Sequence, residues 1–132
     1  MFRKYKRLLI YKLKKKINID IDAKTENETL DHLFTFYGSD KAEKWNGGKG
    51  HGYSEFYNKE LKEKKKETVN ILEIGSYSGS SAAAFAKFFV NSKIFCLDIN
   101  ITNFKYKSKN IDVHGVNITQ KREILNFFKE IE

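Results

Sequence analysis

Residues 69–100 read VNILEIGSYSGSSAAAFAKFFVNSKIFCLDIN, and this stretch decides the fold. It opens with a short apolar run, the pattern of a parallel strand buried on both faces. The run consists of Val69, Ile71, Leu72 and Ile74, with Glu73 near its end. Gly75 and Gly79 interrupt that run, and a segment rich in alanine and phenylalanine follows without a helix breaker. A second apolar run ends at Asp98. The stretch predicts a β-α-β unit whose first turn, built from small residues, lets a nucleotide-like ligand approach a helix N-terminus.

Composition limits what the rest of the chain can be. Its 132 residues give room for one domain, and a hydrophobic share of 40% is enough for a core. Cys96 is the only cysteine, so no intramolecular disulfide is possible, and its place in an apolar run predicts a buried side chain, not a nucleophile. No apolar run is long enough to span a membrane, and no signal-peptide core follows the N-terminus. We therefore expect a cytoplasmic protein.

The net charge of +8 comes from one segment. Residues 1–16 hold eight lysines and arginines and no acid, so basic and acidic residues balance in the remainder. In this segment Phe2, Tyr5, Leu9 and Leu13 recur at helical spacing, which predicts a basic amphipathic helix. Three interpretations stay open: the helix packs its apolar stripe on the domain, binds an anionic membrane surface, or binds nucleic acid.

Two further helices are expected before the central unit. Residues 18–22 resemble a short connector, and Thr25 with Glu28 has the spacing of a capping box. Apolar residues at helical intervals follow until Gly38, which ends that helix. The second helix is expected over residues 53–61.

Between these helices lies the glycine cluster of residues 38–61, GSDKAEKWNGGKGHGYSEFYNKEL. Four glycines between positions 47 and 52 predict a mobile loop around Lys49 and His51. The sequence argues against a phosphate loop, because no strand precedes GGKG and neither Ser nor Thr follows its lysine. The loop is either a flexible connector or a lid beside a ligand pocket.

The C-terminal part predicts one more strand and one more helix. Residues 100–110 look irregular, and the strand then runs from Ile111 to a break near Gly115. Asn117 lies at its carboxyl end, and Thr119 is expected to cap the last helix.

If the three strands are parallel, their carboxyl ends form one edge where a ligand binds. Glu73, Gly75, Gly79, Asp98 and Asn117 all lie there. Asp98 follows the turn by about 20 residues, the distance at which an acid accepts hydrogen bonds from ribose hydroxyls. The turn is E-x-G-x-x-x-G, not the G-x-G-x-x-G of dinucleotide sites, and its acid would repel a pyrophosphate.

ILEIGSYSGSS together with CLDI resembles the first two motifs of class I S-adenosylmethionine-dependent methyltransferases. The resemblance implies S-adenosylmethionine as cofactor, with the glycine turn under its methionine part, the first acid near its amino group and the second acid on its ribose. The first acid would be Glu73 and the second acid Asp98. The glycine turn would be formed by Gly75, Ser76, Tyr77 and Gly79. Ile99 would flank the adenine, and Asn117 would lie at its edge. The alternative is a Rossmann-like turn that binds no cofactor.

The upstream residues SDK…HGYSEFYNKEL are similar to those of macrolide-sugar O-methyltransferases and cephalosporin hydroxylase-like proteins. This resemblance, over about residues 35–132, implies that Asp40, Lys41, His51 and Tyr53 belong to a cap over cofactor or substrate. It also implies a sugar or small hydroxylated acceptor. The acidic D-D-G-S-H-like segment of that subgroup, which holds a metal and a catalytic base, has no counterpart here. We therefore assign no catalytic residue and no metal site, and expect a truncated chain, weakly active or inactive alone.

The expected fold class is α/β, a partial Rossmann-like parallel sheet of about three strands preceded by an α-helical N-terminal segment. Residues 1–22 form the basic helix and connector, residues 23–68 the helical cap segment, and residues 69–132 the truncated S-adenosylmethionine-binding domain. Three hypotheses of function follow: the cofactor-binding half of a methyltransferase, a non-catalytic module, or a nucleic-acid methyltransferase. The module would pair with itself or a partner through an exposed strand edge or the basic helix.

Overall fold

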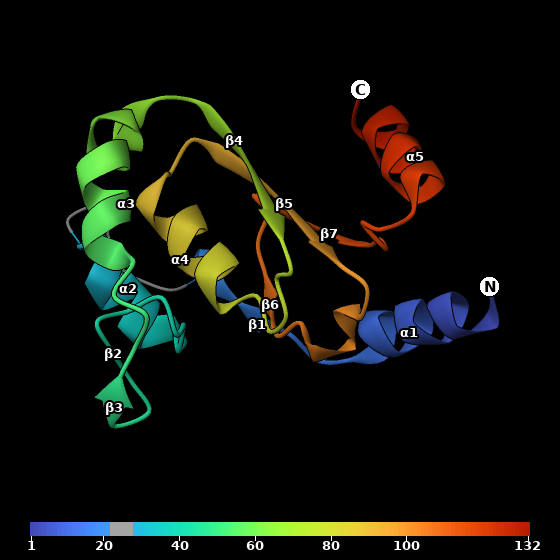
Figure 1. Ribbon diagram of the computed structural model, residues 1–132, viewed down its shortest axis with the longest axis horizontal. Coiled ribbons are helices and arrows are strands. Elements are labelled where there is room, and N and C mark those ends of the chain that lie inside the picture. Colours follow the sequence, from blue (N-terminus) through green and yellow to red (C-terminus); the bar gives the residue numbers. More distant parts are fainter. Residues whose placement is uncertain (22–27) are drawn as a thin grey trace.

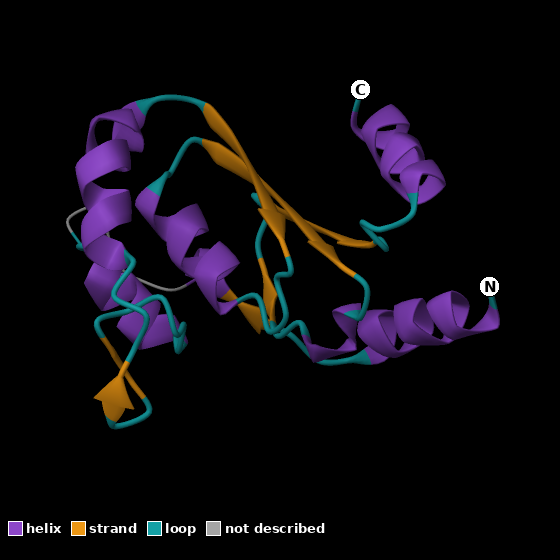
Figure 2. Cartoon of the chain, in the orientation of Figure 1, coloured by secondary structure: helices purple, strands orange, loops and turns teal. Residues whose placement is uncertain are grey.

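The computed structural model describes residues 1–21 and 28–132. The chain forms α-helices, short 3-10 helices (η) and strands, arranged as in Figures 1 and 2. In order these are α1 (Phe2–Leu13), β1 (Ile17–Asn18), η1 (Ile19–Ile21), α2 (Leu30–Tyr37), β2 (Lys44–Trp45), β3 (Gly48–Lys49), α3 (Ser54–Leu61), η2 (Lys62–Lys66), β4 (Val69–Ile74), α4 (Ser80–Phe88), β5 (Ser92–Asp98), η3 (Ile101–Asn103), β6 (Tyr106–Lys107), β7 (Ile111–Gly115) and α5 (Lys121–Ile131).

The three long strands form one parallel sheet in the order β4-β5-β7. Ile71 lies opposite Ile94, which lies opposite Ile111, so the predicted apolar runs meet in register. Helices α2, α3 and α4 gather on one side of this sheet, and α1 and α5 lie on the other (Figure 1). The predicted α/β class with a three-stranded Rossmann-like sheet is confirmed. Within the described residues β4 is an edge strand, with Leu72 and Ile74 exposed.

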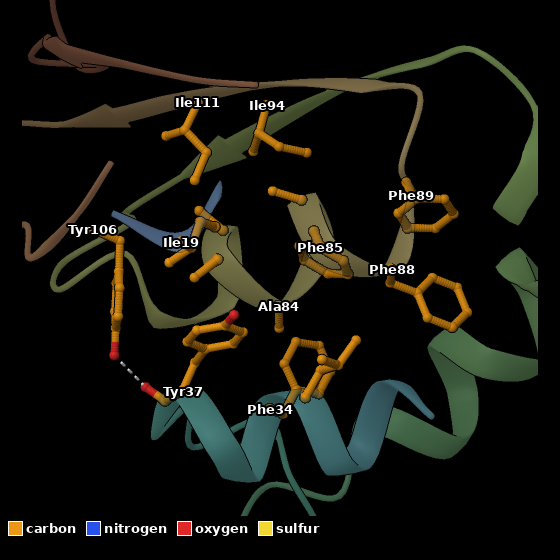
Figure 3. Close-up of a cluster of buried hydrophobic side chains, with 14 of the residues drawn as sticks. Ile19, Phe34, Tyr37, Ala84, Phe85, Phe88, Phe89, Ile94, Tyr106 and Ile111 are labelled. Atoms are coloured by element: carbon orange, nitrogen blue, oxygen red, sulfur yellow. Dashed lines mark hydrogen bonds between the residues drawn. The ribbon is translucent and has the colours of Figure 1, made fainter. Parts of the chain in front are cut away.

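The main core lies between the sheet, α4 and α2 (Figure 3). Phe34 of α2 meets Phe85 of α4 edge to face, with ring centroids 5.4 Å apart, a geometry worth about 1 kcal/mol beyond simple burial. The Tyr106 hydroxyl donates a hydrogen bond of 2.9 Å to the carbonyl of Tyr37 (Figure 3). Ile19, from the N-terminal segment, is buried in the same cluster. One core therefore draws on all three predicted segments.

The expected connector at residues 18–22 is part of the fold over its described residues, 18–21. Ile17 and Asn18 form β1, which pairs in parallel with Tyr106 and Lys107 of β6. The second strand of this pair lies in residues 100–110, which were expected to be irregular. Each strand is only two residues long, so neither produces the apolar run by which strands are recognised in a sequence.

The C-terminal end of α2 lies where the sequence predicts it, and the N-terminal end does not. Gly38 ends the helix as predicted, and it does so in the left-handed conformation, with φ 74°. At the other end the N-cap is Thr29, whose hydroxyl accepts the backbone N–H of His32 at 3.2 Å. The predicted capping residue, Thr25, lies outside the described residues.

Within the glycine cluster, residues 44–49 form a hairpin where an irregular loop was expected. Strands β2 and β3 are antiparallel, and both Asn46 (φ 48°) and Gly47 (φ 77°) of the intervening turn adopt left-handed conformations, as in type I′ hairpins. The flanking backbone is fastened by His51 N–H to Asp40 O at 2.7 Å. Gly50 passes so close to the backbone of Ala42 that a Cβ at Gly50 would lie 2.0 Å from the Ala42 carbonyl oxygen.

The start of α5 differs from the prediction. The helix begins at Lys121, and Thr119 does not cap it. Instead the backbone N–H and hydroxyl of Thr119 donate to the Asn117 side-chain oxygen at 3.1 and 2.8 Å. Thr119 therefore closes a local turn that precedes the helix.

Helix α1 is present, but its predicted stripe does not pack on the domain. No residue of α1 is buried, and Phe2 and Leu13 at its two ends are 83% and 78% exposed. The domain contacts come from the opposite side of the helix. None of the described helices combines the length and apolar character needed to cross a bilayer.

Gly79, at the N-terminus of α4, is fixed by two constraints. Its φ of 77° is left-handed, and a Cβ at this position would lie 2.4 Å from the Phe104 ring. Phe104 is fully buried, so it has little room to move.

We expect Gly79→Ala to lower the free energy of unfolding by about 2–5 kcal/mol, the combined cost of a left-handed alanine and an overpacked ring. The matched control is Gly38→Ala, because Gly38 has φ 74° and no atom within 4 Å of the added Cβ. Urea unfolding should show a clearly larger loss for Gly79→Ala. Equal losses would mean that the Phe104 contact does not constrain the turn.

Candidate functional site

The site is built around the turn that joins β4 to α4. Gly75, Tyr77 and Gly79 all have positive φ, of 78°, 44° and 77°. The N–H of Gly75 donates to the carbonyl of Leu97 on β5 at 2.8 Å, so the turn leaves the sheet in a fixed position. Left-handed tyrosine is strained, and such strain is concentrated at functional sites.

A cavity of about 500 Å³ lies between this turn and the hairpin segment. It joins residues from two parts of the sequence, because Gly75, Ser76 and Tyr77 line it together with Asp40 and Lys41. Further lining residues come from the end of α2, the hairpin, the start of α4 and the segment before β6: Tyr37, Gly38, Ser39, Trp45, Asn46, Ser78, Ser80, Ser81 and Lys105.

Glu73 lies behind the cavity lining, near the end of β4. One carboxylate oxygen, Oε1, accepts a hydrogen bond from the Ser81 hydroxyl and lies 4.0 Å from the Lys41 ammonium. The other, Oε2, is buried and has no hydrogen-bond partner among the described residues. Burial raises the pKa of the Glu73 carboxyl, although the Ser81 hydroxyl and the Lys41 charge act in the opposite direction. A buried acceptor without a donor is costly, which marks this position as a place for a donor group.

Of the four predicted cap residues, Asp40 and Lys41 line the cavity, and His51 and Tyr53 lie outside its lining. Lys41 contacts the site directly, because its ammonium also lies 3.4 Å from the Ser81 hydroxyl. His51 and Tyr53 do not line the cavity; their rings stack on each other with centroids 5.4 Å apart. His51 Nε2 lies 3.3 Å from a carboxylate oxygen of Asp40. His51 therefore contacts Asp40 from outside the cavity lining, and Tyr53 stacks on His51.

Asp98 ends β5 beside the turn. Its Oδ2 accepts the backbone N–H of Tyr77 and its Oδ1 accepts that of Asn100, each at 2.8 Å. A carboxylate oxygen has two lone pairs, so both oxygens can still accept further donors. The next residue, Ile99, is 55% exposed and lines a second cavity of about 270 Å³, which Val116 also lines.

Asn117 is placed at the carboxyl end of β7 but lines neither cavity. Its backbone N–H donates to Glu123 at 2.8 Å, and this bond lowers the pKa of the Glu123 carboxyl. Its side-chain oxygen holds Thr119. In this structure Asn117 organises the start of α5.

The remaining titratable candidates are structural. The His32 ring pairs with Glu28, and His114 packs edge to face on Phe127 with centroids 4.9 Å apart, so both are surface or packing residues as predicted. Cys96 is buried as predicted, and burial raises the pKa of its thiol. In the two described ranges, no three His, Cys, Asp or Glu side chains gather into a metal site.

Four residues of the site were not predicted from the sequence. Ser81 ends the ILEIGSYSGSS motif but is given no role by it, and Lys105 lies outside any motif. Trp45 could have been found through the adjacent Asn-Gly pair, a strong hairpin signal. Phe104, an isolated aromatic in the sequence, contacts the turn only because the chain returns to it after β5.

The fold is shared with a solved methyltransferase. MycE, described as a methyltransferase from the mycinamycin biosynthetic pathway in complex with Mg, SAH and mycinamycin VI, matches with a TM-score of 0.63 and 19% identity over 80% of this chain. A second MycE structure, with Mg and SAH, gives 0.64 and 19% over 78%. In both cases the match spans 29% of the MycE chain. No protein-family model and no curated protein matches the sequence.

Glu73 makes the free energy of unfolding depend on pH. Its pKa is higher in the folded chain than the value of about 4.3 expected when unfolded, so the folded state loses stability as pH rises from that value through the raised pKa. Glu73→Gln removes this loss. Its free energy of unfolding relative to wild type should therefore increase across that interval and then level off, as measured by urea unfolding from pH 4 to 8.

The matched control for this series is Glu55→Gln, an exposed acid on α3. Because its side chain is exposed, this substitution should change the free energy of unfolding by less than about 0.5 kcal/mol. A Glu73→Gln curve parallel to wild type would contradict the raised pKa.

Proposed function

We propose that the chain binds S-adenosylmethionine at the β4–α4 turn and forms the cofactor-binding part of a methyltransferase. The observation that carries this proposal is the unpaired, buried oxygen of Glu73 beside a cavity floored by a glycine turn. The amino group of the cofactor's methionine part is a cationic donor that meets this need. When bound, the cofactor supplies a methyl group for transfer to a nucleophile.

The other residues of the site fit the same ligand. Asp98 retains lone pairs for two ribose hydroxyls, and Ile99 offers an exposed apolar surface for the adenine. The first turn of α4 has no side-chain cap, so its backbone N–H groups are available to the cofactor's carboxylate. The chain's role is to hold and orient the cofactor, an effect that supplies a large part of catalysis in transfer reactions.

We further propose a sugar or other small hydroxylated molecule as the methyl acceptor. The support is the resemblance of residues 38–61 and their position at the cavity, through Asp40, Lys41 and Trp45. The chain spans about 29% of the length of the MycE chains that it matches. We assign to this chain the binding of the cofactor at the β4–α4 turn.

Binding can be followed through Trp45, the only tryptophan, which lines the cavity. Titration with S-adenosylmethionine or its demethylated product should change its fluorescence in a saturable manner. Asp98→Asn should weaken binding about 10- to 100-fold, the range expected when a charged acceptor is lost.

The matched control is Asp112→Asn, which neutralises an acid on β7 whose carboxylate pairs with Lys93 at 3.0 Å on the surface. It should change affinity by less than about twofold, because exposed pairs contribute little. Both variants should melt cooperatively. No saturable signal with folded wild type, or equal affinity of the two variants, would contradict the proposed site.

A further inference from the structure

The side of α1 that faces the domain carries Lys4, Arg7 and Tyr11, and Tyr11 packs against the main core. The Arg7 guanidinium donates to the carbonyl of Ile99 at 2.8 Å, and the Lys14 ammonium donates to that of Thr102 at 2.9 Å. The Lys4 ammonium lies 3.3 Å from the Glu123 carboxylate. These three cations follow each other at helical spacing, so they define one face of the helix. That face points to the domain.

The apolar stripe of α1 lies on the opposite face. Phe2, Tyr5, Leu9 and Leu13 are 83%, 65%, 58% and 78% exposed. An ordinary surface helix buries its main apolar stripe. Helix α1 packs Tyr11 on the core and leaves this stripe of four residues in water. Four large apolar side chains in one exposed row indicate a surface that is covered by a partner.

The charges that flank this stripe identify the partner. At 3.6 residues per turn, Lys12 lies at one border of the stripe and Lys6 at the other. Together with Arg3 and Lys15, they make no hydrogen bond or ion pair within the part of the chain that the structure describes. Residues 1–16 contain no acid. A row of apolar side chains bordered by unpaired cations is complementary to the acyl chains and anionic headgroups of a lipid bilayer.

We infer that α1 is a docking surface for anionic membranes, inserting Phe2, Tyr5, Leu9 and Leu13 into the interface while Lys6 and Lys12 contact the headgroups. The inference rests on the face that α1 exposes and is independent of the proposed cofactor. Because Arg7 holds the residue next to Asp98, docking places the carboxyl edge of the sheet near the lipid surface. A second copy of the chain fits less well, because two such helices would bring their unpaired cations together.

The test is co-sedimentation of the full chain with phosphatidylcholine vesicles, with and without about 30% phosphatidylserine. Wild type should bind the anionic vesicles, and much less the neutral ones, and binding should weaken in high salt. Leu9→Ser combined with Leu13→Ser should weaken binding at least tenfold. Lys6→Gln combined with Lys12→Gln should weaken it about 20-fold, at roughly one factor of five per cation.

Two control pairs change the same side-chain types elsewhere. Phe56→Ser with Ile118→Ser removes exposed apolar side chains from other surfaces, and Lys59→Gln with Lys62→Gln removes two exposed cations near the end of α3. Both pairs should bind vesicles as wild type does, and all variants should keep the wild-type circular dichroism spectrum.

Three results would overturn the inference. The first is no binding of wild type to anionic vesicles. The second is equal weakening by the α1 pairs and the control pairs. The third is a dimer that the Leu9 and Leu13 substitutions dissociate, or tight binding to nucleic acid, in either case without vesicle binding.

Discussion

The parallel register between β4 and β5 determines the geometry of the site. Because Ile74 lies opposite Leu97, the next N–H in the chain, that of Gly75, still reaches the Leu97 carbonyl. Asp98 then ends beside the turn and accepts the N–H of Tyr77. A slip of one residue would turn every side chain of β4 to the other face and remove these bonds. The pairing of β4 with β5 therefore also sets the distance between Glu73 and Asp98.

The same register gives Glu73 its unusual environment. Glu73 lies opposite Cys96, on the side of the sheet that α4 covers, where a charged group loses its hydration. Ser81 and Lys41 compensate one carboxylate oxygen and leave the other without a donor. An interior that leaves a buried acceptor unpaired gives up stability, and such sites are typical of ligand binding. The cavity beside Ser81 and Lys41 offers a route by which a donor can arrive.

The sequence predicts well whatever depends on long apolar periodicity. The three sheet strands, α4 and the end of α2 at Gly38 follow from patterns of several residues or from glycine chemistry. The two-residue strands β1 and β6 do not, because their pairing joins residues about 90 positions apart. The exposed stripe of α1 was equally hidden: periodicity shows that a stripe exists, but the contacts of Arg7 and Lys14 decide which side meets the domain. The roles of the individual site residues stay predictions.

In the proposed site, a cationic ligand group completes the hydrogen bonding of Glu73. Binding such a group favours the ionised carboxylate, so it lowers the pKa of Glu73 and releases the proton that the free chain holds between the ordinary carboxyl pKa and the raised one. Calorimetry in buffers of different ionisation enthalpy, over a pH series that starts at about 4.3, measures that proton directly. We expect S-adenosylmethionine to release a proton from wild type in the lower part of this series and Glu73→Gln to abolish the release. Identical heats in all buffers, or the same release by both proteins, would contradict it.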